Sequence, residues 1–285
     1  MAKLKYTFKT DTLFKMLFVQ HRDLLRQLVA TLLDIPFESI ERLEITNSEM
    51  SPAIISGKFC RLDINMEVDG QLVNLEIQVR DEDDYPERVL FHWSRMYSSA
   101  LPSGEDYQKL PRTVVISIID FNLFDSTEFH SEFRPLEVTR GELLSDRMSL
   151  HFFELRKLPA EIDPENMLHL WLSLFRAETE EAIKKIKAME VPVMEQAISA
   201  YDRIARDPDF QELANQREIA RHNEASALRH ARDQGRVQGQ IQGRMQADKE
   251  WQGVVAGKDA EIERILAENA SKDALIARLQ AKFGN

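Results

Sequence analysis

Apolar residues recur at helical spacing between Asp11 and Leu33, with a polar interruption from Gln20 to Asp23. Because apolar residues three and four positions apart form one face of an α-helix, this pattern predicts a helix that ends before Pro36. A short strand is expected next, between Ser39 and Met50, where apolar residues are scattered among polar neighbours.

Strict alternation of apolar and polar residues on both sides of Asp69-Gly70 predicts a β-hairpin. Both central residues of a type I′ turn need positive φ, and Asp-Gly is a favoured pair for that turn. With these two residues as the turn, Ile64 lies opposite Leu75 and Asp63 lies opposite Glu76. Period two then sorts the side chains into two faces. The apolar face holds Leu62, Ile64, Met66, Val68, Val73, Leu75, Ile77 and Val79, and the polar face holds Arg61, Asp63, Asn65, Glu67, Asn74, Glu76 and Gln78.

The following segments alternate between helical and extended patterns. Residues 86–100 have helical spacing, and Asp84 just before them can cap the helix. The continuous apolar run Val114 to Ile119 is typical of a strand covered on both faces. Met148 to Leu155 predicts another strand and Asn166 to Ala177 another helix. The order indicates an α/β or α+β fold with a mixed central sheet flanked by helices.

Beyond Glu178 the pattern is almost wholly helical, so we predict a first domain at residues 1–177 and a helical C-terminal region at residues 178–285. A ragged heptad repeat runs from Trp251 to Phe283, with Asn269 at one core position and lysines at two others. A buried Asn can set the register of a paired coil. Two alternatives stay open: a coiled coil that forms a homo-oligomer, such as a dimer, or a frayed amphipathic helix.

Composition narrows the class of protein. Of 285 residues, 43% are hydrophobic, which is ordinary for a globular protein and excludes collagen-like and low-complexity chains. The single cysteine, Cys60, cannot form an internal disulfide, so a cytoplasmic location is expected. Residues 1–15 lack the apolar core of a signal peptide, and no apolar run approaches the about 18 residues of a membrane helix. No membrane partner is therefore predicted.

The formal net charge of −11 argues mildly against a protein that coats nucleic acid, because Lys and Arg supply the attraction to phosphate. A local site is still compatible with this charge. Between Arg217 and Glu250, seven Lys or Arg stand against five acids, which fits either an ordinary charged helix or a DNA contact. The chain shows no phosphate-binding loop, no glycine-rich dinucleotide motif and no Ser/His/Asp order.

Asp63 and Glu76 carry the candidate chemistry. Carboxylates directly opposite on antiparallel strands repel each other, and a divalent cation between them relieves this repulsion. Mg²⁺ is commonly held by one or two carboxylates together with water and phosphate oxygens, and Gln78 projects from the same face. These residues describe a metal-assisted phosphodiester hydrolase. The alternative is that the polar face is simply solvated.

The run from Asp11 to Phe124 resembles the recombination-promoting nuclease and transposase family, a branch of the PD-(D/E)-x-K nuclease superfamily. The matching motifs are Asp11–Lys15, Arg61–Asp63, Asn74–Gln78, Arg88–Tyr97, Gly104–Tyr107 and Ile119–Phe121. The resemblance implies an αβββαβ restriction-endonuclease-like core and Mg²⁺-dependent DNA cleavage, with Mn²⁺ as an alternative ion. It also implies metal ligation by Asp63, Glu76 and the backbone carbonyl of Ile77.

Three positions depart from the superfamily pattern or leave a choice. Gln78 stands where the superfamily has its lysine, and a glutamine cannot act as a general base. Leu62 stands where a proline usually precedes the first acid. Asp11 occupies the region where the superfamily often supplies a further acidic residue, so it is a candidate catalytic residue, with a helix cap as the alternative.

Three functions follow from these observations. The first is a Mg²⁺-dependent DNA endonuclease linked to recombination or mobile DNA, with Asp63 and Glu76 as ligands and Gln78 orienting water or phosphate. The second is a catalytically degenerate interaction protein that assembles through its C-terminal helix. A true transposase is less favoured, because no separate basic DNA-reading domain is evident.

Overall fold

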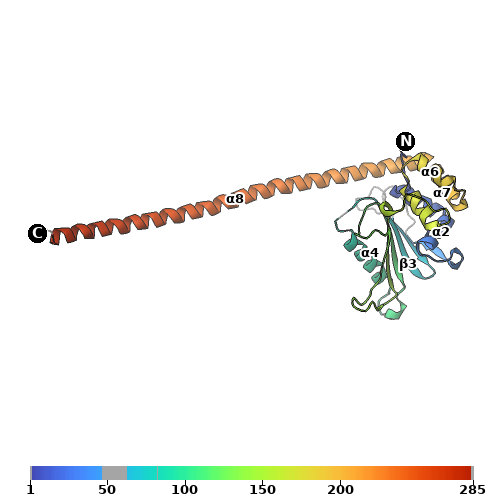
Figure 1. Ribbon diagram of the computed structural model, residues 1–285, viewed down its shortest axis with the longest axis horizontal. Coiled ribbons are helices and arrows are strands. Elements are labelled where there is room, and N and C mark those ends of the chain that lie inside the picture. The colour runs from blue at the N-terminus through green and yellow to red at the C-terminus, as the bar shows by residue number, and fades with distance from the viewer. Residues whose placement is uncertain (1, 47–62, 82, 284–285) are drawn as a thin grey trace. The chain divides into compact units, whose positions relative to one another are not determined.

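The computed structural model describes residues 2–46, 63–81 and 83–283, shown in Figure 1. Cys60, Arg61 and Leu62 lie outside these ranges, as does the end of the strand predicted at Ser39 to Met50. Contacts divide the chain into two compact units, Met1–Ala220 and Arg221–Asn285. The predicted division at residues 177 and 178 stays a prediction.

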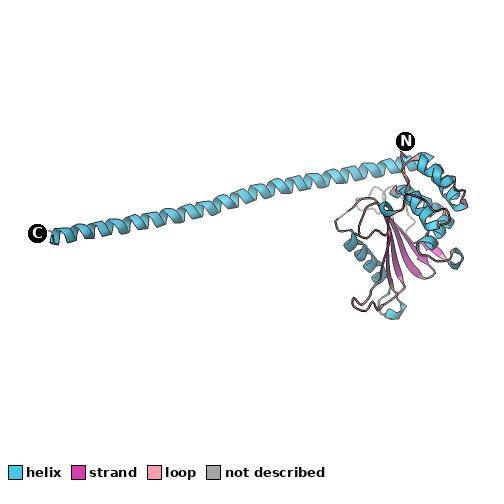
Figure 2. Ribbon diagram, in the orientation of Figure 1, coloured by secondary structure: helices cyan, strands magenta, loops and turns pink. Residues whose placement is uncertain are grey.

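A six-stranded mixed sheet forms the centre of the first unit (Figure 2). Its strands, in spatial order, are β1 (Leu43–Ile45), β2 (Ile64–Val68), β3 (Gln71–Gln78), β4 (Thr113–Ile119), β6 (Met148–Glu154) and β5 (His130–Phe133). β3, β4 and β6 are parallel neighbours, and the other pairs are antiparallel. The predicted α/β fold with a mixed sheet is confirmed; β5 was not predicted.

The β2–β3 hairpin has the predicted register, with Ile64 opposite Leu75 and Val68 opposite Gln71. Asp69 and Gly70 form the turn with φ of 47° and 79°, the positive values that a type I′ turn requires. The Oδ1 atom of Asp69 also accepts a hydrogen bond of 2.7 Å from the backbone N–H of Arg42, next to β1. The turn chemistry therefore sets which residues face each other.

The helices agree with the predicted segments. They are α1 (Asp11–Gln20), α2 (Arg22–Leu32), α4 (Tyr85–Ser99), α5 (Met167–Arg176), α6 (Glu180–Lys187), α7 (Pro192–Arg206) and α8 (Pro208–Phe283). The interrupted pattern near residue 20 corresponds to a break at His21 between α1 and α2. Asp84 occupies the N-cap position of α4, but the prediction that its side chain caps the helix is wrong, because it makes no capping hydrogen bond.

Helices cover both faces of the sheet (Figure 1). On one face, α1, α2, α5 and α7 pack against the predicted apolar side of the hairpin around the fully buried Trp171. On the other face, α4 packs through Tyr85 and Val89 against Val115 of β4 and Phe152 of β6. The polar side of the hairpin therefore belongs to the face that α4 covers.

The last helix, α8, is 76 residues long. Its first turns contribute Phe210 and Ala214 to the core of the first unit. From Ser226 to Lys282 its side chains are exposed in the single chain. Within the described ranges, no helix combines the length and the apolarity needed to cross a membrane.

Candidate active site

The open end of the β2–β3 hairpin brings the predicted site residues together. Ile64 and Leu75 are the last paired residues of the ladder, and continuing the register by one residue places Asp63 opposite Glu76. Cross-strand neighbours of this kind have Cβ atoms about 5 Å apart. Gln78 ends β3 two residues later, on the same face.

Asn74 lies next to this carboxylate pair and is buried, with 4% of its surface exposed. Its Nδ2 group donates hydrogen bonds of 2.7 Å to Oδ2 of Asp63 and of 2.7 Å to Oδ1 of Asn65. A buried amide needs such partners, because an unpaired one would lose its hydration without compensation. The alternative of a simply solvated polar face is therefore wrong at Asn74.

The carboxylate of Glu76 is half-buried and held through one oxygen. Its Oε1 accepts a hydrogen bond of 2.5 Å from the hydroxyl of Tyr85 and one of 3.1 Å from Oγ of Ser117. Ser117 is the register partner of Glu76 on β4 and is fully buried. Within the part of the chain that the structure describes, Oε2 of Glu76 receives no hydrogen bond. One oxygen of this carboxylate is thus anchored while the other remains available.

Backbone geometry indicates where the Ile77 carbonyl points. The carbonyl of Gln78 accepts a hydrogen bond of 2.9 Å from the N–H of Asp120, so the backbone groups of Gln78 face β4. Backbone groups alternate between the two neighbours of a strand, and those of Ile77 therefore face the β2 side, where Asp63 lies. The Gln78 side chain donates from Nε2 to the carbonyl of Arg80 at 2.8 Å, and its Oε1 accepts no hydrogen bond from the residues that the structure describes.

Asp11 is the first residue of α1, and Thr10 occupies the N-cap position. One carboxylate oxygen accepts a 2.8 Å hydrogen bond from the N–H of Thr12. The other lies 3.3 Å from Nε of Arg217, in an ion pair. Within the described residues, Asp11 makes no contact with Asp63 or Glu76, so the structure brings three of the four predicted side chains together.

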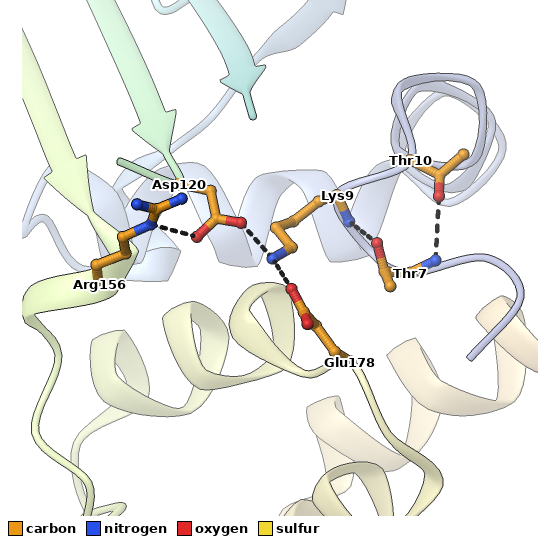
Figure 3. Close-up of polar contacts among 6 residues, drawn as sticks. All are labelled: Thr7, Lys9, Thr10, Asp120, Arg156 and Glu178. Atoms are coloured by element: carbon orange, nitrogen blue, oxygen red, sulfur yellow. Dashed lines mark hydrogen bonds and ion pairs between the residues drawn. The ribbon is translucent and has the colours of Figure 1, made fainter. Parts of the chain in front are cut away.

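An ionic cluster that the sequence did not predict surrounds Lys9 (Figure 3). The ammonium of Lys9 lies 2.5 Å from Oδ2 of Asp120 and 2.7 Å from Oε1 of Glu178, and its side chain is only 6% exposed. Arg156 approaches the other oxygen of Asp120 at 3.7 Å. The hydrogen bond from Lys9 lowers the pKa of Glu178. The one local signal was the position of Asp120, directly after the carboxyl end of a buried parallel strand, where functional groups often gather.

Strands β5 and β6 carry a network of hydrogen-bonded polar side chains that the sequence pattern did not predict. His130 Nε2 lies 3.1 Å from His151 Nδ1, and Ser149 Oγ lies 2.8 Å from His151 Nε2. Ser149 also donates to Oε1 of Glu132 at 2.7 Å. Burial lowers the pKa of His151 to about 4, and nearby Glu132 opposes this shift. Ser149 is fully buried, so its hydroxyl is inaccessible to a substrate.

The donor set at the hairpin end suits a hard divalent ion. Two opposed carboxylates and one backbone carbonyl are oxygen ligands, and Mg²⁺ is commonly held by one or two carboxylates with water completing its shell. No group of three or more His, Cys, Asp or Glu side chains arranged for a metal occurs in residues 2–46, 63–81 and 83–283. Within the described residues, the hairpin end supplies a partial shell, the kind that a phosphate oxygen and water complete.

Comparison with known proteins gives one match. The family model for the PD-(D/E)XK nuclease family transposases matches residues 8–231, a range that contains the whole sheet and the hairpin end. No curated protein and no solved structure matches the chain.

Proposed function

Since the chain belongs to the PD-(D/E)XK nuclease family transposases, we propose that it is a Mg²⁺-dependent DNA endonuclease linked to recombination or mobile DNA. Family membership implies DNA as a partner and phosphodiester hydrolysis as the general reaction. The particular metal and the site residues are our proposal. It is supported by the β2–β3 register, which, continued by one residue beyond Ile64 and Leu75, places Asp63 opposite Glu76.

Asp63, Glu76 and the Ile77 carbonyl are the groups that would hold the ion, either Mg²⁺ or Mn²⁺. A bound ion of this kind lowers the pKa of a water molecule and neutralises charge that develops on the phosphate. Asn74 holds Asp63 in place through its 2.7 Å hydrogen bond, and Tyr85 and Ser117 do the same for Glu76. Each of these buried donors stabilises the negative charge of the carboxylate that it contacts.

Gln78 stays neutral at every pH, so it cannot remove a proton from water. Its Oε1 can accept a hydrogen bond from the attacking water, while the bond from Nε2 to the Arg80 carbonyl restrains the amide. We assign Gln78 the task of orienting the water or the scissile phosphate. The role of Asp11 as a further acidic residue of the site stays a prediction.

The observation that carries the proposal is the half-anchored carboxylate of Glu76 opposite Asp63. The test is nicking of supercoiled plasmid in Mg²⁺ by the wild type, by Asp63→Ala and by Glu67→Gln, a control further along the same face of β2. We expect Asp63→Ala to abolish nicking without loss of the fold, and Glu67→Gln to keep it. Unchanged nicking by Asp63→Ala would refute the site.

The competing hypothesis is a nuclease-like protein that no longer cuts and acts through its C-terminal helix. It predicts no nicking by the wild type and no Mn²⁺ binding that depends on Asp63. Calorimetric titration of the wild type and Asp63→Ala with Mn²⁺ separates the two hypotheses without DNA.

We further propose that α8 joins two copies of the chain through residues 251–283. Apolar residues at heptad positions are about half exposed in the single chain: Val255 50%, Ile262 54%, Ile265 47%, Ile276 52% and Leu279 47%. A coil formed with a second copy would cover them, and facing Asn269 residues would set the register. A dimer also doubles the DNA contacts of a protein whose net charge is −11.

A further inference from the structure

Tyr85 is the first residue of α4 and is fully buried. Its ring packs edge-to-face against Phe121 and Phe152, with centroids 5.6 and 6.3 Å away. The guanidinium of Arg88 lies 4.8 Å from the ring centroid. These contacts place the ring independently of its hydroxyl, so the core already determines where the hydroxyl lies.

That hydroxyl donates to Oε1 of Glu76 at 2.5 Å, a length typical of an O–H group bound to a carboxylate. Such charge-assisted bonds are about twice as strong as neutral ones. A tyrosine hydroxyl buried this deeply needs a hydrogen-bond partner, and Glu76 provides one. The bond therefore links the start of α4 to the end of β3.

Ser117 on β4 donates to the same oxygen at 3.1 Å. Two donors from two different elements, α4 and β4, thus converge on Oε1 of Glu76. Among the described residues no donor approaches Oε2. This asymmetry restrains rotation of the carboxylate and leaves Oε2 as the oxygen able to contact an ion.

We propose that Tyr85 is a positioning residue for Glu76, acting through the Tyr85–Glu76 hydrogen bond to orient Oε2 for divalent-cation binding. The inference rests on the proposed metal site at Asp63 and Glu76. Hydrogen-bond partners of ligating carboxylates typically change metal affinity by 10- to 100-fold when they are removed. Tyr85→Phe deletes only the hydroxyl and should therefore weaken Mn²⁺ binding by about 10-fold or more.

Tyr97→Phe is the matched control on the same helix. The Tyr97 ring stacks on Trp93 with centroids 5.0 Å apart, and its hydroxyl makes no hydrogen bond within the described residues. Both variants lose one hydroxyl from α4, but within the described residues the Tyr85 hydroxyl contacts the site and the Tyr97 hydroxyl does not. Ser117→Ala is a second variant, which removes the hydrogen bond that β4 donates to Oε1 of Glu76.

The experiment measures Mn²⁺ affinity by calorimetry without DNA, and then the Mg²⁺ dependence of plasmid nicking. We expect Tyr85→Phe to raise the Mn²⁺ dissociation constant and the half-saturating Mg²⁺ concentration together, with the KM for plasmid unchanged. Tyr97→Phe should match the wild type in both. Combining Tyr85→Phe with Glu76→Gln should weaken Mn²⁺ binding no further than Glu76→Gln alone.

The outcomes separate this inference from the proposed function. Mn²⁺ affinity of Tyr85→Phe equal to that of the wild type overturns the positioning role, even if the wild type nicks DNA. A wild type that binds Mn²⁺ through Glu76 without nicking refutes the endonuclease, while the affinity of Tyr85→Phe still decides the role of the hydroxyl. A wild type without Mn²⁺ binding overturns the metal site and this inference together.

Discussion

Low pH should destabilise the first unit through the network of hydrogen-bonded polar side chains on β5 and β6. In this network His151 is 6% exposed. Burial lowers the pKa of His151 from 6.5 to about 4, and the neighbouring His130, Arg112 and Arg134 act in the same direction. Glu132 opposes the shift without reversing it. The folded protein therefore holds this imidazole neutral at a pH where the unfolded chain binds a proton.

The direction in which stability changes with pH follows from the number of protons that each state binds. Stability rises with pH wherever the unfolded state binds more protons, so the contribution of His151 is complete above the unfolded pKa of about 6.5. It falls as the pH decreases and is fully lost only below the folded pKa of about 4. With these two values, linkage gives a loss of about 2 kcal/mol in unfolding free energy between about pH 7 and pH 5.

The perturbation is His151→Gln, which removes the titrating ring and keeps a polar group near Ser149 and His130. Urea unfolding at pH 7 and pH 5 gives the free energy of unfolding of each protein, and the change between the two pH values is compared. The wild type should lose about 2 kcal/mol more than the variant. An equal loss of unfolding free energy in both proteins would refute the reasoning, because His151 would then contribute nothing to the pH dependence of stability.

Two further predictions concern the ionic cluster and the C-terminal helix. Lys9→Met should lower the free energy of unfolding by about 3 kcal/mol, because it leaves Asp120 without its closest cation; a loss below about 1 kcal/mol in urea would contradict this. Asn269→Ile should tighten self-association and broaden the range of oligomers, because a polar core residue specifies register at a cost in stability. Sedimentation velocity tests this, and a wild type that stays monomeric at every concentration would contradict it.

Local sequence was sufficient for much of the fold. The Asp69-Gly70 pair predicted the hairpin register, because a two-residue turn leaves only one alignment of its strands. Helical spacing likewise predicted α1, α2, α4 and α5, because each buries one apolar stripe. The hairpin register also placed Asp63 opposite Glu76, and the motifs indicated the family that the match to residues 8–231 shows.

The short strand β5 escaped prediction, since its residues alternate weakly and its pairing partner, β6, lies further along the chain. The Lys9–Asp120 ion pair joins residues 111 positions apart, and Ser149, His151 and Glu132 meet only because β5 pairs antiparallel with β6. No local pattern encodes such contacts.

The surroundings of the candidate site were decided by tertiary packing in the same way. From the sequence, Asn74 and Glu76 were equally consistent with a solvated strand face. The placement of α4 over that face brings Tyr85 to Glu76, and Asn74 is buried in the folded unit. Turn chemistry and periodicity act within a few residues, so the sequence by itself determined most of the elements and the hairpin register. Which helix covers that pair depends on burial of apolar surface across the whole unit, and only the tertiary structure decided it.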